Sequence, residues 1–374
     1  MIKTKIFAAY LPQYHEIPEN NEFWGKGFTD WVGVKKAKPQ FDNHYQPRKP
    51  LDNNYYDLSI PDTITWQAEL ANKYGVNGFN IYHYWFKGGK NILGKPAEII
   101  LNNKNINIEF FFSWDNTSWV RSWGNIKGNA WAPAFDGKIE KKKTMLMEFE
   151  YGIEKDWIQH FEFLLPYFMD ERYLKIDNKP VFCLMKNTDF KIISKMHKKW
   201  NQLAKSYGFD GVFLMTGRKM IFNKCITDSQ FTYQPGFSGW NKRESIEARL
   251  QKYFHIVPRR DDYVKYNYDF EMVWKRIIKD ATKNITKNMY FGGMVGFDDT
   301  PRRGNNARIL SNCSPDIFEK YFEKLYRINC ENDKKIVFIT AWNEWGEGAY
   351  LEPDEKYQYA YLEALKRAKD RVII

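Results

Sequence analysis

The chain has 374 residues, 43% of them hydrophobic, and a formal net charge of +11. It is long enough to bury a sizeable core, and no apolar run approaches the ~18 residues that a membrane-spanning helix needs. The four cysteines are widely spaced and form no Cys-x-x-Cys or Cys/His cluster, which argues against a zinc site and against a disulfide framework. We therefore expect reduced thiols, no signal peptide and a cytoplasmic protein.

Basic residues gather in four short runs, at residues 35–38, 141–143, 259–260 and 302–303. Such runs suit nucleic acid, an anionic membrane surface or an acidic glycan, although most basic runs are solvated surface. None lies in a recognisable nucleic-acid-binding motif, so we expect no nucleic-acid partner. Peripheral attachment to a membrane stays an alternative. We expect no metal and no cofactor, and the sequence leaves the oligomeric state open.

Eight apolar segments of strand length alternate with segments of helical periodicity. Strands are predicted at residues 5–11, 78–84, 108–114, 180–185, 212–216, 230–234, 289–295 and 335–340. Helices are predicted at residues 61–74, 95–103, 155–168, 189–207, 269–282, 315–329 and 355–369. Continuously apolar strands between helices are typical of a parallel sheet that is buried on both faces.

Eight such units predict a single α/β domain over residues 1–374, folded as a (β/α)8 TIM barrel with long loops at its C-terminal face. An open doubly wound sheet would need a glycine-rich phosphate loop after the first strand, where residues 11–15 read Leu-Pro-Gln-Tyr-His instead. A long loop, 15–56, precedes the first helix. Insertions at 116–154, 236–268 and 298–314 are long enough to wall a cleft.

Polar and aromatic residues follow nearly every predicted strand, and a barrel brings these strand ends to one face. Aromatic faces can pack on the apolar faces of sugar rings, so this pattern indicates a carbohydrate site. The alternative for each aromatic residue is core packing. The candidate substrate-binding residues are Tyr14, His83, Tyr84, Trp85, Trp114, Asp115, Asn116, Asp298, Arg302, Trp342, Asn343 and Trp345.

Glu344 and Glu347 stand three residues apart, directly after the last predicted strand. Cleavage of a glycosidic bond needs two carboxyl groups beside that bond, so we predict that this pair is catalytic. A surface turn with two solvated carboxylates is the alternative. The acid of such a pair needs a raised pKa while its partner stays ionised, and the sequence does not say which is raised. Arg302 could bind a phosphate or a uronate.

Several segments carry a family resemblance, at residues 10–15, 23–31, 44–48, 82–86 and 342–353. The chain resembles WbsX-type proteins, which are described as glycosyltransferases of bacterial surface-polysaccharide clusters. These are similar in turn to family-99 glycoside hydrolases, the endo-α-mannosidases and mannanases.

The hydrolase resemblance implies a (β/α)8 barrel and retention of anomeric configuration. It implies that Glu344 is a general base on the sugar 2-hydroxyl, giving a 1,2-anhydro intermediate, and that Glu347 is the general acid. Gly346 departs from the hydrolases, which usually carry His there, so sugar preference and subsite contacts do not carry over.

The leading hypothesis is a retaining, endo-acting glycoside hydrolase that acts on a bacterial polysaccharide or a lipid-linked oligosaccharide. A glycosyltransferase or transglycosylase that builds O-antigen or capsule is the second hypothesis. A non-catalytic glycan-binding protein is the third. The sugar and its linkage are not determined by the sequence.

Overall fold

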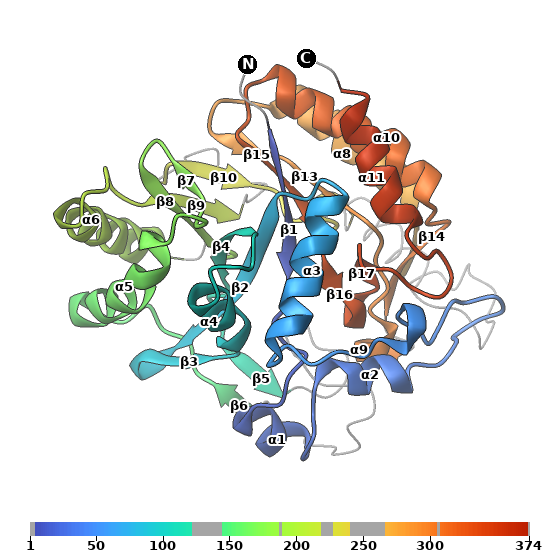
Figure 1. The fold of residues 1–374 in the computed structure, drawn as a ribbon, viewed down its shortest axis with the longest axis horizontal. Helices are drawn as coiled ribbons and strands as arrows, with labels where there is room; N and C mark the ends of the chain where they lie inside the picture. Colours follow the sequence, from blue (N-terminus) through green and yellow to red (C-terminus); the bar gives the residue numbers. More distant parts are fainter. Residues whose placement is uncertain are drawn as a thin grey trace, which may run out of the picture.

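The fold is an α/β barrel of parallel strands with helices outside it (Figure 1). The computed structural model describes residues 4–121, 144–186, 189–217, 227–239, 266–304 and 307–372. Seven barrel strands lie side by side in the order β10-β9-β8-β4-β2-β1-β15. Their bounds are β10 (Ser229–Phe231), β9 (Phe213–Gly217), β8 (Lys179–Leu184), β4 (Glu109–Trp114), β2 (Gly78–Phe86), β1 (Lys5–Tyr10) and β15 (Ile336–Thr340).

One segment joins the two ends of this order. β12 (Met289–Tyr290) pairs with β10, and β13 (Gly292–Met294) pairs with β15, all in parallel. The barrel is therefore nearly closed, as the sequence predicts for a TIM-type fold. The predicted strand at 289–295 consists of these two pieces, separated by Phe291.

The strands are apolar throughout because both of their faces are covered. Every residue of β15 is buried, and its neighbour β1 is buried from Ile6 onward. Gly78 opens β2 where no side chain fits, since a Cβ there would lie 2.8 Å from the carbonyl carbon of Glu109 and closer still to the ring of Phe7. This glycine lets three adjacent strands approach one another at the start of the barrel.

Helices cover the outside of the barrel, close to the predicted positions. They are α3 (Pro61–Lys73), α4 (Lys95–Asn102), α5 (Glu154–Met169), α6 (Phe190–Ser206), α8 (Phe270–Asn284), α10 (Pro315–Glu331) and α11 (Ala360–Asp370). Asp189, Asp269 and Ser314 accept hydrogen bonds from backbone amides in the first turns of α6, α8 and α10, which fixes where these helices begin. The last helix starts at Ala360, five residues after its predicted start.

We predicted a loop at 15–56, but this stretch also forms two short helices. These are α1 (Pro18–Trp24) and α2 (Asp30–Lys36). The second contacts α9 (Thr300–Arg303) and the 3-10 turn η4 (Trp345–Glu347), so the N-terminal segment packs against the last strand's motif. In Figure 1 these elements lie together at the lower end of the barrel, beyond the tip of β1.

The remaining strands are short additions to the barrel. They are β3 (Lys90–Ile92), β5 (Trp119–Arg121), β6 (Thr144–Met147), β7 (Lys175–Ile176), β11 (Tyr266–Asp269), β14 (Arg308–Ser311), β16 (Asn343–Glu344) and β17 (Ala349–Tyr350). Most of the predicted insertions at 116–154 and 236–268 lies outside the described residues.

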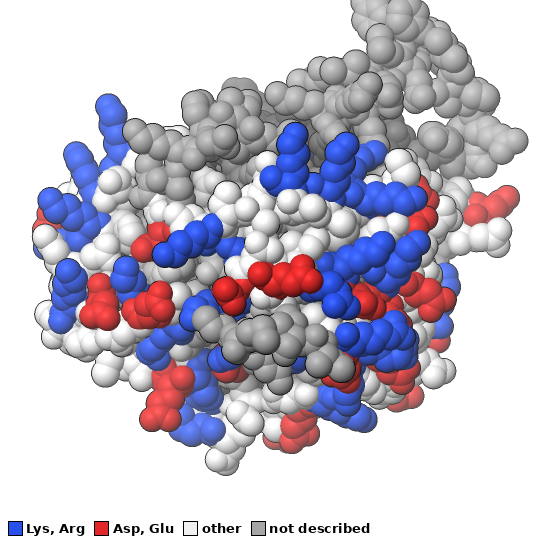
Figure 2. All heavy atoms as spheres, turned by 90° about the horizontal axis from the view of Figure 1, so that it is seen from above, with Lys and Arg blue, Asp and Glu red and all other residues white. Residues whose placement is uncertain are grey.

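On the face shown in Figure 2, positively charged side chains are mixed with negatively charged ones. Arg367 and Arg371, for example, both pair with Glu319, at 2.7 Å each. Of the four basic runs, 141–143 and 259–260 lie outside the described residues, and Arg302 is a mostly buried member of the site described below. Within the described part of the chain, no helix is both long and apolar enough to span a membrane.

Candidate active site

The last barrel strand ends in a tight hairpin that carries both predicted glutamates. β16 pairs antiparallel with β17, so that Glu344 lies opposite Ala349, and the turn η4 connects them. Residues three apart lie on the same side of a 3-10 turn, which places Glu344 and Glu347 together. Gly348, with φ of 57°, supplies the left-handed residue that closes the turn.

The hairpin is fastened to the end of β1. The side chain of Asn343 exchanges two hydrogen bonds with the backbone of Leu11, at 2.7 and 3.0 Å. The hydroxyl of Tyr14 donates to the carbonyl of Asn343 at 2.6 Å and accepts from the amide of Trp345 at 3.1 Å. These buried contacts explain why the site lies where the first and last strands meet.

One guanidinium contacts both carboxylates. Arg302 Nη1 donates to Glu347 Oε1 at 2.6 Å, and Nη2 donates to Glu344 Oε2 at 3.2 Å. The same Nη2 lies 3.2 Å from Asp30 Oδ2. Three carboxylates from three separate elements therefore surround one arginine. The structure brings together Glu344, Glu347, Arg302 and Tyr14 from the predicted set, and adds Asp30.

The two glutamates have different surroundings. The side chain of Glu344 is 5% exposed, whereas that of Glu347 is 24% exposed. The pKa of Glu344 is raised to about 8, mainly by burial and then by the like charges of Glu347 and Asp30, while Arg302 opposes the shift. Burial and the neighbouring carboxylates thus favour the protonated form of Glu344.

Two tyrosines that contact each other lie close enough to the pair to be affected by its charge. The hydroxyls of Tyr82, on β2, and Tyr233, after β10, lie 2.5 Å apart. Burial raises the pKa of each phenol well above its ordinary value, and the charges of Glu344 and Glu347 add to the shift. Tyr84 experiences the charges of Asp115 and Glu344 in the same way. These hydroxyls can donate hydrogen bonds to a bound sugar or to the carboxylates.

Asp298 is buried and holds the turn that carries the two glutamates. It is fully buried and its Oδ2 accepts from Gln46 at 2.7 Å, contacts His44 Nε2 at 2.8 Å and lies 3.7 Å from Arg48. Although burial opposes ionisation, these partners hold the pKa of Asp298 at about 2. Its backbone amide donates to the carbonyl of Glu347 at 2.6 Å. The predicted substrate contact is therefore a structural anchor of the turn.

Trp342 and Trp345 are fully buried and do not present a face to the site. Trp342 packs on Phe79, with ring centroids 5.2 Å apart. Trp345 stacks on Tyr350 at 3.7 Å. Tyr14 is likewise fully buried, against Trp31. The ring of Tyr14 has no exposed face in this structure, so it does not offer the sugar platform that we expected.

Three predicted substrate contacts point away from the glutamates. His83 lies 2.8 Å from His160 of α5, through their Nε2 atoms, and Trp85 stacks on the same histidine at 4.5 Å. Trp114 packs edge-on against His160 at 4.6 Å. These side chains fill the layer between β2, β4 and α5. For His83 and Trp85 the physical reason is strand alternation, because Tyr82 and Tyr84 point inward and their neighbours in β2 must point outward.

Asp115 and Asn116, the two residues after β4, have different surroundings. Asn116 is buried and exchanges two 2.8 Å hydrogen bonds with the backbone of Lys186, which joins the ends of β4 and β8. Asp115 accepts from Thr117 at 2.7 Å, and its charge reaches Tyr84. Asn116 is therefore a structural residue, whereas Asp115 lies near enough to Tyr84 for its charge to raise the pKa of that phenol.

Sequence reasoning missed Asp30, Tyr82 and Tyr233 as site residues. The signal for Asp30 was its place in a stretch that mixes charged and aromatic residues. The signal for Tyr82 was the alternation of side chains along β2. Nothing local marks Tyr233. Among the described side chains, no group of three His, Cys, Asp or Glu is arranged to hold a metal ion.

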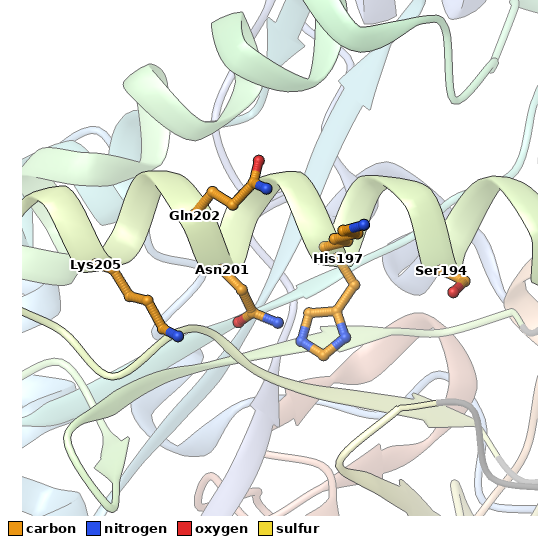
Figure 3. Close-up of a pocket in the computed structure, with 6 residues that line it drawn as sticks. Ser194, His197, Asn201, Gln202 and Lys205 are labelled. Atoms are coloured by element: carbon orange, nitrogen blue, oxygen red, sulfur yellow. The ribbon is translucent and has the colours of Figure 1, made fainter.

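A separate open hollow of about 370 Å³ lies on α6, far from the glutamates in the chain (Figure 3). Its polar side chains serve the packing of α6 on the barrel. Asn201 Oδ1 accepts from the amide of Val212 at 2.7 Å, and His197 Nε2 lies 3.3 Å from Asp228. The hollow contains no carboxylate among its lining residues and is not the candidate site.

A family model described as Glycosyltransferase WbsX matches residues 6–365. The chain belongs to the WbsX family. The protein WxcX of Xanthomonas campestris pv. campestris (strain B100) is 30% identical over 380 residues, which cover 99% of this chain and 50% of that relative. The WbsX chain described here thus spans about half the length of the relative.

Solved structures share the fold. The GH99 endo-alpha-mannosidase of Bacteroides thetaiotaomicron, in complex with bis-tris propane, matches with a TM-score of 0.57 at 12% identity, covering 100% of this chain and 98% of that one. A "glycoside hydrolase-like protein" matches with a TM-score of 0.58 at 14% identity, covering 98% and 94%. At such identities the likeness concerns the fold alone, and it agrees with the nearly closed parallel barrel of the WbsX chain.

Proposed function

We propose that this WbsX chain is a retaining, endo-acting glycoside hydrolase of a bacterial polysaccharide or lipid-linked oligosaccharide, with Glu344 and Glu347 as its catalytic pair. The observation that carries the proposal is the contact of both carboxylates with adjacent nitrogens of Arg302, where the last strand leaves the barrel. Active sites of this fold lie at the carboxyl ends of the strands.

The chemistry of the pair suits a glycosidic bond. One carboxyl must give a proton to the leaving oxygen while the bond to C1 breaks, and a second carboxylate must accept a proton from the attacking hydroxyl. Two carboxylates with different burial and a shared arginine can divide these tasks. The inward-facing phenols of Tyr82 and Tyr233 offer hydrogen bonds for orienting sugar hydroxyls.

The test is turnover by single variants. Wild type, Glu344→Gln and Glu347→Gln are incubated with α-mannosides and with bacterial lipid-linked or O-antigen oligosaccharides, and products are read by mass spectrometry. We expect cleavage by wild type and a loss of at least about 1,000-fold in each variant, as for loss of a catalytic group. Glu363→Gln, an exposed carboxylate on α11, is the matched control and should keep full activity.

Glycosyl transfer is the second candidate, and the family description favours it. It predicts a gain of mass that requires a sugar donor, so each reaction is repeated with nucleotide sugars and with lipid-linked donors. Transfer without any hydrolysis would replace the hydrolase proposal. Glycan binding that survives the loss of both glutamates, without product under any condition, would contradict catalysis by this pair.

A further inference from the structure

The helix α6 presents a strongly basic face to solvent. Its residues 190–206 contain five lysines and no aspartate or glutamate. The exposed lysines are Lys191, Lys195, Lys198 and Lys205. Their spacing of four, three and seven residues places them on one side of the helix. The buried side chains, which lie on the opposite side, are Ile193, Met196, Trp200 and Ala204. The helix thus has a core face and a positively charged outer face.

The charge of this face is not compensated by neighbouring acids. Among the residues that the structure describes, the four exposed lysines pair with no carboxylate, whereas the fifth, Lys199, pairs with Glu154 of α5 at 2.6 Å. Asp189, which precedes the helix, is engaged as its N-cap. The exposed charges of α5 have both signs, and they are Glu154, Lys155 and Glu162. The excess of positive charge in this part of the surface therefore belongs to α6.

Exposed apolar side chains lie at the ends of the same two helices. Ile153 precedes α5 and is 62% exposed, Met169 ends α5 and is 56% exposed, and Tyr207 follows α6 and is 48% exposed. They are three of the seven large apolar side chains that are exposed in the described part of the chain. The ring of Tyr207 lies 6.3 Å from that of Phe161 on α5. Long lysine stems beside an exposed tyrosine suit a boundary between water and hydrocarbon.

The chemistry of this face favours a bilayer surface over nucleic acid. Lysine carries a compact charge that attracts phosphate-bearing headgroups without directional fit. Nucleic acids are held by arginine forks and by aromatic rings that stack on bases, and the exposed residues of α6 include neither. Figure 1 shows α6 at the outer edge of the barrel, where a row of lysines can meet a flat surface.

We propose that the exposed lysines of α6 bind the anionic surface of a lipid bilayer, with Tyr207 at the edge of the contact. Each lysine near an anionic surface contributes a factor of about five to the partition coefficient. The four lysines together therefore give a factor of several hundred, which is enough to hold the protein at the bilayer without a spanning helix. The inference does not depend on turnover of a glycan.

Co-sedimentation with vesicles tests the proposal on the full chain without any glycan. We expect binding to phosphatidylcholine vesicles that contain about one third phosphatidylglycerol, and none to phosphatidylcholine alone. Binding should disappear at about 1 M NaCl, where the Debye length falls to about 3 Å. The double variant Lys195→Gln/Lys198→Gln should lower the partition coefficient about 25-fold. Lys324→Gln/Lys366→Gln, on the exposed sides of α10 and α11, is the control with the same change in net charge and should stay within about twofold of wild type.

Three results would overturn the proposal. The first is an absence of binding to anionic vesicles at low salt. The second is an equal loss in the two double variants, because net charge and not the α6 face would then explain binding. The third is tight binding of an oligonucleotide, lost in the α6 variant, without binding to vesicles. Tyr207→Ser should weaken vesicle binding, and an unchanged partition coefficient would remove Tyr207 from the contact. A protein that binds vesicles through α6 but cleaves no glycan would refute the proposed function alone.

Discussion

The indole of Trp345 donates a 2.7 Å hydrogen bond to the carboxyl of Glu352, and both groups are buried. Glu352 also accepts from Tyr56 and Gln67, at 2.8 and 2.7 Å, so it collects donors from three separate segments. Trp345 lies between the two catalytic candidates, and this contact fixes the turn that carries them.

Glu352→Ala should therefore destabilise the fold and disturb the site. Buried donors left without an acceptor cost about 1–3 kcal/mol each, so we expect a loss of roughly 3 kcal/mol or more in the free energy of unfolding. Urea denaturation measures it. Glu355→Ala, three residues later and half exposed, is the control and should change stability by less than about 1 kcal/mol. Equal effects of the two variants would contradict the anchoring role.

Stability should fall as pH rises from about 5 to about 8. Glu344 and Glu352 have pKa values raised by burial, to about 8 and about 7, from an unfolded value near 4.5. A raised folded pKa stabilises the protein fully below the unfolded value, and this contribution is lost as pH rises through the folded value. We expect a loss of up to about 6 kcal/mol between pH 5 and 8, measured by urea denaturation. The variant Glu344→Gln should flatten the curve, and an unchanged slope in that variant would contradict the assignment.

Removing the hydroxyl of Tyr82 should lower activity, whereas removing that of Tyr173 should lower stability. The Tyr82 hydroxyl meets Tyr233 beside the glutamates, so Tyr82→Phe should lower kcat/KM about tenfold with little loss of stability. The Tyr173 hydroxyl donates to the carbonyl of Val181 at 2.8 Å in the outer layer. Tyr173→Phe should cost about 1 kcal/mol of stability and leave kcat/KM unchanged. The site assignment fails if Tyr82→Phe keeps full activity.

Asp298→Asn should act on stability more than on chemistry. The substitution keeps the backbone amide that holds Glu347 but removes the charge that pairs with Arg48 and contacts His44. Breaking a buried ion pair costs about 3–5 kcal/mol, and thermal or urea unfolding measures it. Asp298 has a lowered pKa, so its contribution is present above the unfolded value and is lost as pH falls toward 2. Asp333→Asn, on the surface, serves as the control, and its stability should match wild type.

Local patterns predicted the frame and the position of the glutamates. Continuous apolar strands with helices between them indicate a parallel barrel, because only burial on both faces explains such strands. The predicted starts at 189, 269 and 315 lie within one residue of the observed starts of α6, α8 and α10. The position of Glu344 and Glu347 after the last strand followed from the same alternation.

The direction of side chains was harder to predict. His83, Tyr84 and Trp85 were all assigned to substrate, yet adjacent residues of a strand point to opposite faces, and only Tyr84 points inward. Likewise, we predicted that aromatic residues near strand ends bind sugar, but Tyr14 and Trp345 are buried and stabilise the hairpin. Period-two alternation in β2 was visible in the sequence. The burial of Tyr14 depends on α2, which no local signal placed.

The sequence by itself determined that strands and helices alternate into a barrel and that two glutamates follow its last strand, because these features depend on residues close together in the chain. Only the tertiary structure decided what surrounds the glutamates. Asp30 and Arg302 are separated by 272 residues, and they meet over Gly346 because α2 and α9 pack on the same turn. Burial and charge at that meeting point arise from contacts between distant segments, and no local pattern in the sequence contains them.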